Sequence, residues 1–279
     1  MKNPMVLDLG VLPEHIPPQI LEQTGNFPEA YAAFCKELLT GLKGYIPAIR
    51  VHFAEFALIG GLGVEILRDV LSHAKEQGYY IFLDGIEALS PVSAERNAYW
   101  LFGMNTLWEF NGLIISAYAG SDVLKPYIDR ITESGRELFV IARTSNKSAT
   151  EIQDLLTGSR LAHMAVADIV NRFAPQFVGK LGYSSVGIVA AASAAESLRT
   201  LRGKFKDLFF LLDGLDYPNA NAKNCSYAFD KLGHGAAVCA GTSVTAAWQE
   251  ERAPEDYVSC AVRSAERLKK NLSRYITIL

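Results

Sequence analysis

The feature that most limits the fold of this chain is an alternation of short apolar segments with amphipathic ones, repeated eight times. Short apolar segments bounded by turn residues are typical of strands that are buried on both faces. Alternation with helices implies parallel pairing, and eight repeats fit a closed (β/α)8 barrel. The expected strands are Met5–Leu9, Ile46–Phe53, Tyr80–Leu83, Gly112–Ser116, Glu137–Ala142, Ser185–Ala190, Asp207–Leu212 and Gly235–Ala240.

We expect residues 1–279 to form a single domain, because this length suits one barrel of roughly 250 residues and no linker divides the chain. The alternative is a doubly wound open sheet, which favours a glycine-rich turn after the first strand; here that turn holds only Gly10. Ser148 and Glu151 fit a capping box and predict a helix that runs toward Phe173, with or without a break. The other expected helices are Pro28–Leu42, Val64–Gln77, Ser93–Phe110, Asp122–Glu133, Ala194–Arg202, Ala222–Leu232 and Glu255–Tyr275.

The composition excludes several classes of protein. Apolar residues make up 49% of the chain and the formal net charge is -3, which gives no electrostatic reason to expect nucleic acid or an anionic membrane as a partner. No apolar run reaches the roughly 20 residues of a membrane span, and no signal peptide is evident. The four cysteines lack CxxC spacing, so we expect no metal site and no disulfides, only reduced thiols in a cytoplasmic protein: Cys35, Cys225, Cys239 and Cys260.

The third expected strand, Tyr80–Leu83, ends at Asp84, and Gly85 then signals a turn. A carboxylate at the carboxyl end of a buried strand is how an α/β barrel builds an active site. The residues that follow do not fit this pattern, because Ile86 and Leu89 are apolar where polar side chains are expected.

The second expected strand carries Arg50 and His52 near its end. A cation in a barrel mouth requires a partner, and Asp84 is the obvious one for Arg50; the resulting ion pair would serve either the chemistry or the structure alone. His52 is the histidine that we single out for a role in a site. The others show no ligand spacing and are expected on the surface or in helices: His15, His73, His163 and His234.

Four segments carry a resemblance to a known family. Phe139–Asn146 ends in R-T-S-N and is followed by Q-D-L within Ile152–Leu155. With Ser93–Glu95 and Gly187–Ser193, these segments resemble the longer bacterial subfamily of the orotidine 5′-phosphate decarboxylases, which carries T-A-E, R-T-S-N, Q-D-L and G-L-V-V-G-A-T at the matching positions. The resemblance implies a (β/α)8 barrel, a homodimer with a shared active site, a nucleotide as ligand and no cofactor.

The catalytic pattern of that family is D-x-K-x-x-D at a strand end, with a further lysine on the preceding strand. An anionic centre at C6 of the pyrimidine requires a fixed cation and a proton donor nearby. By position, Asp84 matches the first aspartate, Ile86 stands where the lysine belongs, and Leu89 stands where the second aspartate belongs. Arg50 replaces the upstream lysine; it keeps the charge but is a poor proton donor, because its pKa exceeds about 12.

The segment that binds phosphate in the family also differs. Its P-G-V-G-x-Q-G loop corresponds to Asp213–Asn219, in which Asp213 and Asp216 would repel a phosphate dianion and Pro218 lacks an amide donor. The arginine of the last strand aligns with Thr242. Gly214 and Gly241 remain as ligand-binding candidates, and a helix N-terminus near Gly241 would suit a weaker anion. Asp213 and Asp216 could also suggest a site for a cation, but two acids in a loop after a strand are a weak signal for one.

Three further positions match ligand contacts of the family. Ser145 and Asn146 match residues at the pyrimidine edge, and Asp8 matches an aspartate that contacts the ribose. Each also has a simpler interpretation, because Ser and Asn often cap helices and Asp8 suits a solvated loop.

These substitutions leave three functional hypotheses open. The first is a family member that has lost ordinary decarboxylation. The second is a non-catalytic scaffold or regulatory partner. The third is a new activity on a small molecule at the same barrel mouth, using Arg50, His52 and Asp84.

Overall fold

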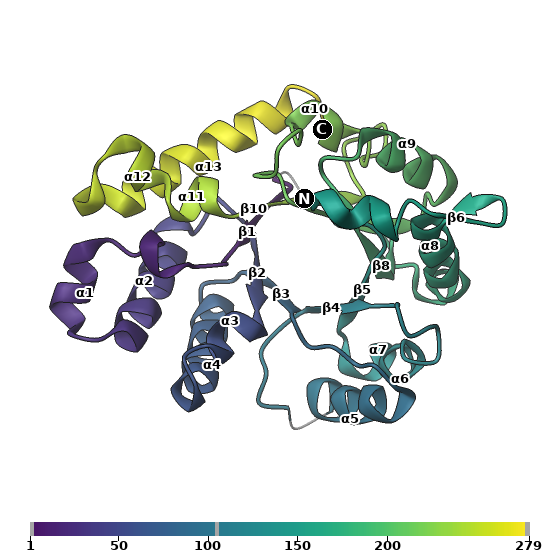
Figure 1. Cartoon of the computed structure of the whole chain (residues 1–279), viewed down its shortest axis with the longest axis horizontal. Helices are drawn as coiled ribbons and strands as arrows, with labels where there is room; N and C mark the ends of the chain where they lie inside the picture. The colour runs from purple at the N-terminus through teal and green to yellow at the C-terminus, as the bar shows by residue number, and fades with distance from the viewer. Residues whose placement is uncertain (1–2, 104–105, 277–279) are drawn as a thin grey trace.

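The computed structural model describes residues 3–103 and 106–276. Eight parallel strands close into a ring in the order β1-β10-β9-β8-β5-β4-β3-β2, and helices surround this ring (Figure 1). The predicted (β/α)8 barrel is therefore confirmed. The barrel strands are β1 (Met5–Asp8), β2 (Ala48–His52), β3 (Tyr80–Asp84), β4 (Gly112–Ser116), β5 (Glu137–Ile141), β8 (Ser184–Ala191), β9 (Leu208–Asp213) and β10 (Ala236–Ala240).

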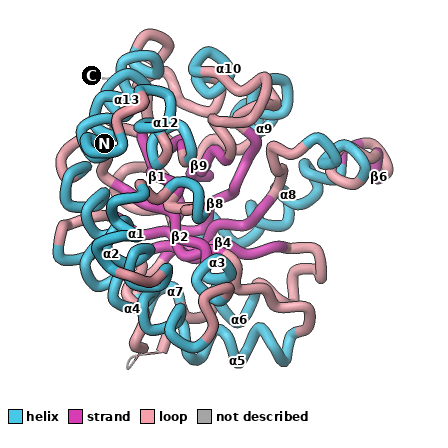
Figure 2. The backbone as a smooth tube through the Cα atoms, turned by 60° about the vertical axis from the view of Figure 1, so that its left-hand side comes forward, coloured by secondary structure: helices cyan, strands magenta, loops and turns pink. Residues whose placement is uncertain are grey.

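The helices cover the outside of the barrel, and Figure 2 shows them around the strands. The α-helices are α1 (Pro18–Thr24), α2 (Phe27–Leu42), α3 (Phe53–Ala57), α4 (Gly61–Glu76), α5 (Pro91–Phe102), α6 (Lys125–Ile128), α7 (Ile131–Ser134), α8 (Ala162–Phe173), α9 (Ala195–Lys204), α10 (Ala222–Ser226), α11 (Thr242–Thr245), α12 (Ala247–Glu251) and α13 (Tyr257–Ser273). Short 3-10 helices span Pro13–His15, Lys147–Glu151, Ala174–Phe177 and Pro254–Asp256. None of the described helices is both long enough and apolar enough to cross a membrane.

The core has two parts, one between strands and helices and one inside the barrel. Inside the barrel, Phe139 occupies the centre, and two glycines on neighbouring strands make room for its ring. A Cβ added at Gly112 would lie 2.9 Å from the ring, and one at Gly187 would lie 2.8 Å from it. The other buried apolar residues of the interior are Val6, Ala48, Phe82, Ile114, Val189, Leu211, Ala237 and Cys239.

The helix expected at 93–110 is shorter than predicted. It begins at Pro91, with Ser90 as the N-cap that accepts a hydrogen bond from the Ser93 backbone, and it ends at Phe102. Residues 106–110 are irregular, whereas residues 104–105 of the prediction lie outside the described residues. The apolar positions up to Phe110 had the spacing of a helix, but Gly103 ends α5 in extended backbone.

The prediction of a helix running from Ser148 was wrong for its first half. Lys147–Glu151 form a 3-10 turn without a side-chain cap. A short hairpin of β6 (Leu156–Thr157) and β7 (Arg160–Leu161) follows and projects from the barrel (Figures 1 and 2). Gly158 adopts a positive φ of 68° in its turn, a conformation that glycine accepts readily and that ends any helix.

Two other helices also differ from the prediction. The segment expected at 122–133 splits into α6 and α7, and the one expected at 222–232 stops at Ser226. All four cysteines are buried and free, as expected. His15 and His163 are buried rather than on the surface. His163 lies in α8 and His15 in a 3-10 helix, so both agree with the expectation of surface or helix positions.

Candidate functional site

The candidate site lies where the barrel strands end. Asp8 ends β1, His52 ends β2, Asp84 ends β3 and Asp213 ends β9. Parallel pairing aligns Asp8 with Arg50, and His52 with Asp84. Because side chains two residues apart point to the same face of a strand, Arg50 and His52 both face into the barrel mouth. The fold therefore gathers these polar side chains at one end.

Arg50 is the centre of this cluster. Its Nε and Nη2 donate hydrogen bonds of 2.9 and 2.5 Å to Asp84 Oδ2, which confirms the predicted pair. Its Nη1 donates a hydrogen bond of 2.5 Å to Asp213 Oδ1 and lies 3.6 Å from Asp8 Oδ2. Burial disfavours the charge on Arg50, but Asp84, Asp8 and Asp213 together raise its pKa well above the ordinary value.

His52 forms a second pair with Asp8. The distance from His52 Nε2 to Asp8 Oδ1 is 2.8 Å, and His52 Nδ1 lies 3.6 Å from Asp84 Oδ2. Burial opposes ionisation of both groups. The hydrogen bond between them and the neighbouring charges together outweigh burial, so that the pKa of Asp8 is lowered and that of His52 is raised. His52 thus lies within the cluster, where the sequence predicted a role for it.

Ile86 and Leu89, which replace the lysine and the second aspartate of the family motif, differ in their exposure to solvent. Ile86 is buried, with 8% of its surface exposed, and packs in the core beside the cluster. Leu89 is 79% exposed and lies on the surface of the loop between β3 and α5. Neither offers a charge or a proton to the barrel mouth.

A cavity of about 150 Å³ opens beside Asp8 and Asp213, two of the partners of Arg50. It brings together five of the predicted ligand-binding residues: Asp8, His52, Gly214, Gly241 and Thr242. Asp213, Asp216 and Tyr217 also line it, from the loop that corresponds to the phosphate-binding segment of the family. Gly10, Glu55 and Cys239 line it as well, and these three were not expected in the site. No lysine is among the described residues that line it.

The amides beside Gly241 are occupied by a carboxylate of the chain itself. Asp216 Oδ2 accepts the backbone N–H of Gly241 at 2.7 Å and that of Ser243 at 3.4 Å. The predicted anion-binding position of Gly241 therefore already holds a negative charge. Thr242 lines the same cavity, but it has no positive charge to offset Asp216.

The side chains of Ser145 and Asn146 make different contacts. The Ser145 hydroxyl donates a hydrogen bond of 2.6 Å to the backbone carbonyl of Asp213, so it fixes the end of β9. Gly214 follows with a φ of +79°, and a Cβ there would lie 2.6 Å from Ser145. Asn146 is exposed and accepts a hydrogen bond from the Thr144 hydroxyl, so the structure does not bring it into the cavity.

The segments that carry R-T-S-N and Q-D-L bind each other. Arg143 donates two hydrogen bonds of 3.0 and 2.9 Å to the carboxylate of Asp154. The backbone N–H of Thr144 donates to the side chain of Gln153 at 2.8 Å. These contacts hold the loop after β5 in place, and this loop in turn positions Ser145.

Glu55 is the acid that sequence reasoning missed. It lies in α3, one turn after His52, and the only signal was this short spacing. Burial raises the pKa of Glu55 to about 7, and its Oε2 has no hydrogen-bond partner among the described residues.

Within the described part of the chain, no group of three or more His, Cys, Asp or Glu side chains is arranged to hold a metal ion.

The comparison with protein families decides where the chain belongs. The sequence profile of the orotidine 5′-phosphate decarboxylase / HUMPS family matches residues 31–257. The chain belongs to this family. Its barrel and the strand-end position of its candidate site agree with that membership, and the resemblance stated from the sequence is confirmed.

Individual family members are distant relatives. An orotidine 5′-phosphate decarboxylase of Rhodopirellula baltica is 28% identical over 244 residues, which cover 85% of this chain and 81% of that protein. One of Clostridium perfringens is 25% identical over 264 residues, covering 94% and 91%.

Solved structures show the shared fold. A putative orotidine-monophosphate-decarboxylase of Toxoplasma gondii superposes with a TM-score of 0.81 at 20% identity, covering 99% of this chain and 93% of that one. The UMP synthase of Leishmania donovani gives 0.77 at 21% identity; the match covers 98% of this chain but only 54% of the synthase.

Proposed function

We propose that this chain is a member of the orotidine 5′-phosphate decarboxylase family that has lost ordinary decarboxylation of orotidine 5′-phosphate. The observation that carries the proposal is the environment of Arg50. Its guanidinium is enclosed by the carboxylates of Asp84, Asp213 and Asp8, all of which belong to the chain itself. Little of its charge remains for a substrate.

Proton transfer is the step that the chain is least able to perform. Decarboxylation leaves a carbanion that must be protonated by a nearby group whose pKa is close to the working pH. Arg50 is unsuitable, since its carboxylate partners raise its pKa further. Ile86, at the position of the family lysine, is buried hydrocarbon. No other described residue of the cavity supplies an ammonium group.

Phosphate binding is disfavoured by both charge and volume. Asp216 already accepts the amide of Gly241, and a phosphate there would meet this carboxylate and that of Asp213. Ligand pockets usually measure about 300–1,000 Å³, whereas this cavity measures about 150 Å³. Both properties argue against a whole nucleotide as the ligand.

The test is an absorbance assay of orotidine 5′-phosphate turnover with the purified protein, beside growth of a uracil-requiring strain that lacks the enzyme. The Clostridium perfringens relative serves as the positive control in both. We expect no turnover and no growth. Growth at the rate given by the control would refute the proposal.

A non-catalytic partner is the second candidate, and the exposed apolar residues near the mouth favour it. Leu89 is 79% exposed and Val92 61%, and Tyr118, which follows the neighbouring strand β4, is 82% exposed. Apolar side chains gathered at adjacent strand ends suit a protein interface. The homodimer expected from the family resemblance would use the same surface, so we propose a second copy of the chain as the first occupant to test, ahead of another protein.

Light scattering after gel filtration measures this directly. We expect a mass of two chains for the wild type and of one chain for Leu89→Asp, because a carboxylate in an apolar contact remains desolvated and unpaired. Leu181→Asp, at a residue that is 88% exposed and lies at the opposite end of the barrel, is the matched control. A wild-type monomer would exclude the homodimer.

A new activity on a small ligand is the third candidate. The hydrogen-bonded pair of His52 and Asp8 lines the cavity beside Glu55, and together these groups are able to exchange a proton near neutral pH. A thermal-shift screen of small neutral and cationic metabolites separates this candidate from the scaffold. A stabilising compound should lose its effect in His52→Gln, and a screen without any stabilising compound would count against it.

A further inference from the structure

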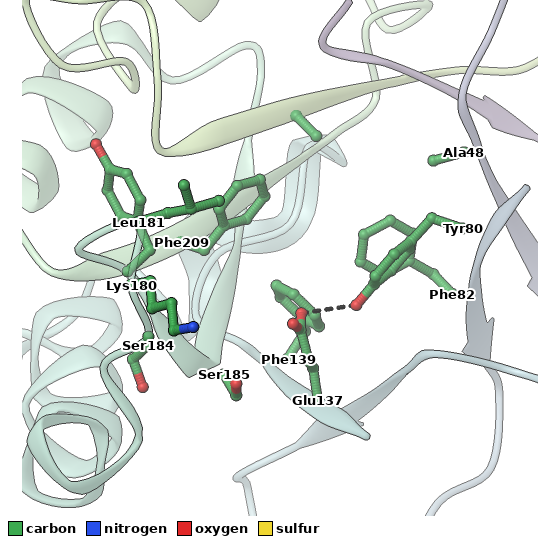
Figure 3. Close-up of a pocket in the computed structure, with 13 residues that line it drawn as sticks. Ala48, Tyr80, Phe82, Glu137, Phe139, Lys180, Leu181, Ser184, Ser185 and Phe209 are labelled. Carbon is green, nitrogen blue, oxygen red and sulfur yellow. Dashed lines mark hydrogen bonds between the residues drawn. The ribbon is translucent and has the colours of Figure 1, made fainter. Parts of the chain in front are cut away.

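A second cavity lies at the opposite end of the barrel, where the strands begin. It measures about 320 Å³, within the usual range for a small-molecule pocket. We propose that it is a binding site for a small aromatic molecule that carries one hydrogen-bond donor. This proposal is independent of the function proposed for the barrel mouth, since it rests on other residues (Figure 3).

The walls of this cavity are aromatic. Five rings follow one another along it: the ring centroids of Tyr80 and Phe82 are 4.8 Å apart, and those of Phe82 and Phe139 are 5.1 Å apart. Phe209 lies 6.2 Å from Phe139, and Tyr183 lies 6.1 Å from Phe209. Planar ligands gain both burial and edge-to-face contacts against such walls.

The cavity exists because small residues stand where a barrel usually has large ones. The interior of such a barrel is normally filled by branched side chains in layers. Here Ala48 at the start of β2 and Ala237 on β10 line the space, and Ser185 lines it from β8. An unfilled apolar space costs the fold dispersion energy, which a ligand of matching shape restores.

Glu137 is the acid among the polar residues of the cavity, which also include Lys180 and Ser185. Its Oε2 accepts a hydrogen bond of 2.6 Å from the Tyr80 hydroxyl, drawn as a dashed line in Figure 3. Its Oε1 accepts no hydrogen bond from any described residue. Burial raises the pKa of Glu137, although the bond from Tyr80 opposes that shift. A half-buried acid with one open acceptor selects a ligand that brings a donor.

A tight turn forms the rim. Gly179 N–H donates to the Tyr183 carbonyl at 2.9 Å, and Gly182 N–H donates to the Gly179 carbonyl at 3.0 Å. Between them Lys180 and Leu181 line the opening, and Leu181 is 88% exposed. A ligand that entered beside the turn would cover part of this leucine, which supplies a further apolar contact.

The experiment uses indole as the probe and benzofuran as its matched comparator, which has the same shape without the N–H. Calorimetry and ligand-observed NMR on the full chain measure their affinities. We expect saturable binding of indole, weaker binding of benzofuran, and a preference between the two that disappears in Glu137→Met. A hydrogen bond to a charged acceptor corresponds to about a tenfold change in affinity.

Filling the cavity tests the location. Ala237→Phe should weaken indole binding by at least about tenfold, and Ser185→Phe provides the same test if the first variant does not fold. Leu156→Phe, on the exposed hairpin, adds a ring elsewhere and should change nothing. The proposal fails if indole does not bind saturably, if both filled variants bind it unchanged, or if a crystal shows side chains of a second copy in the cavity.

Discussion

The carboxylate of Asp216 accepts the backbone N–H of Gly241 at a distance of 2.7 Å, and this contact joins the loop after β9 to the end of β10. Gly241 precedes the short helix α11, so Asp216 supplies an N-terminal acceptor from outside the helix. To bind these amides, an anion would first have to displace the Asp216 carboxylate.

Replacement of Asp216 by alanine should therefore lower the free energy of unfolding. Loss of a capping acceptor costs about 1 kcal/mol, and the exposure of Asp216 keeps the effect at this modest level. Urea unfolding measures it. Asp122→Ala, at an exposed acid in another connection between strand and helix, is the control, and equal losses in the two variants would contradict the capping role.

Replacement of Arg50 by methionine should cost much more. The side chain of Arg50 is only 10% exposed and that of Asp84 only 8%, and removal of one partner of a buried ion pair costs about 3–5 kcal/mol because the other charge stays desolvated. Lys125→Met breaks an ion pair in which both side chains are more than half exposed. Chemical denaturation should show a loss below about 1 kcal/mol there; similar losses for the two variants would mean that Arg50 is well solvated.

Glu55 should make stability depend on pH. Its pKa is 4.5 as an ordinary glutamate and about 7 in the folded chain, because burial disfavours its charge. The folded state therefore holds the proton more tightly, so this contribution is complete below pH 4.5 and is lost as the pH rises through 7. Urea unfolding across this range should show the advantage of the wild type over Glu55→Gln declining with rising pH. The exposed Glu65, changed to glutamine, should give no such trend.

Ile86 and Leu89 should respond differently to truncation. Ile86 is buried in the core, and its replacement by alanine should lower the free energy of unfolding by about 2–5 kcal/mol through lost burial and an unfilled space. Leu89→Ala, at a position exposed in the single chain, should change the free energy of unfolding of the monomer by less than about 0.5 kcal/mol. Thermal unfolding at one protein concentration compares them, and a stable Ile86→Ala protein would show that Ile86 has no packing role.

The sequence was sufficient to predict the barrel and one contact of its site. Strand-like segments with Asp84 and Arg50 near their ends placed both side chains at the same edge of the sheet, and the pair follows from the alignment of adjacent strands. Helix ends were less predictable. Around Ser148 the local capping pattern favoured a helix, whereas the contacts of Arg143 and Thr144 with the next segment favour a compact loop.

The remaining contacts of the site depend on the closed barrel. Asp213 reaches Arg50 from a strand that is not adjacent to β2, so neighbouring strands give no indication of the contact. Asp216 binds a backbone amide, which every residue except proline possesses, and no sequence motif marks it. Glu55 enters the cavity because α3 begins directly after β2, whereas the sequence analysis had extended the strand through Phe53.

The contact between Arg50 and Asp213 spans the barrel mouth, since β2 and β9 are separated in the ring by β1 and β10. This ion pair links two strands that are not neighbours, and their ends cannot separate while it is intact. Amide hydrogens at these two ends should then exchange with solvent in a single concerted opening. In Arg50→Gln, the amide hydrogens at the two strand ends would exchange independently and at different rates.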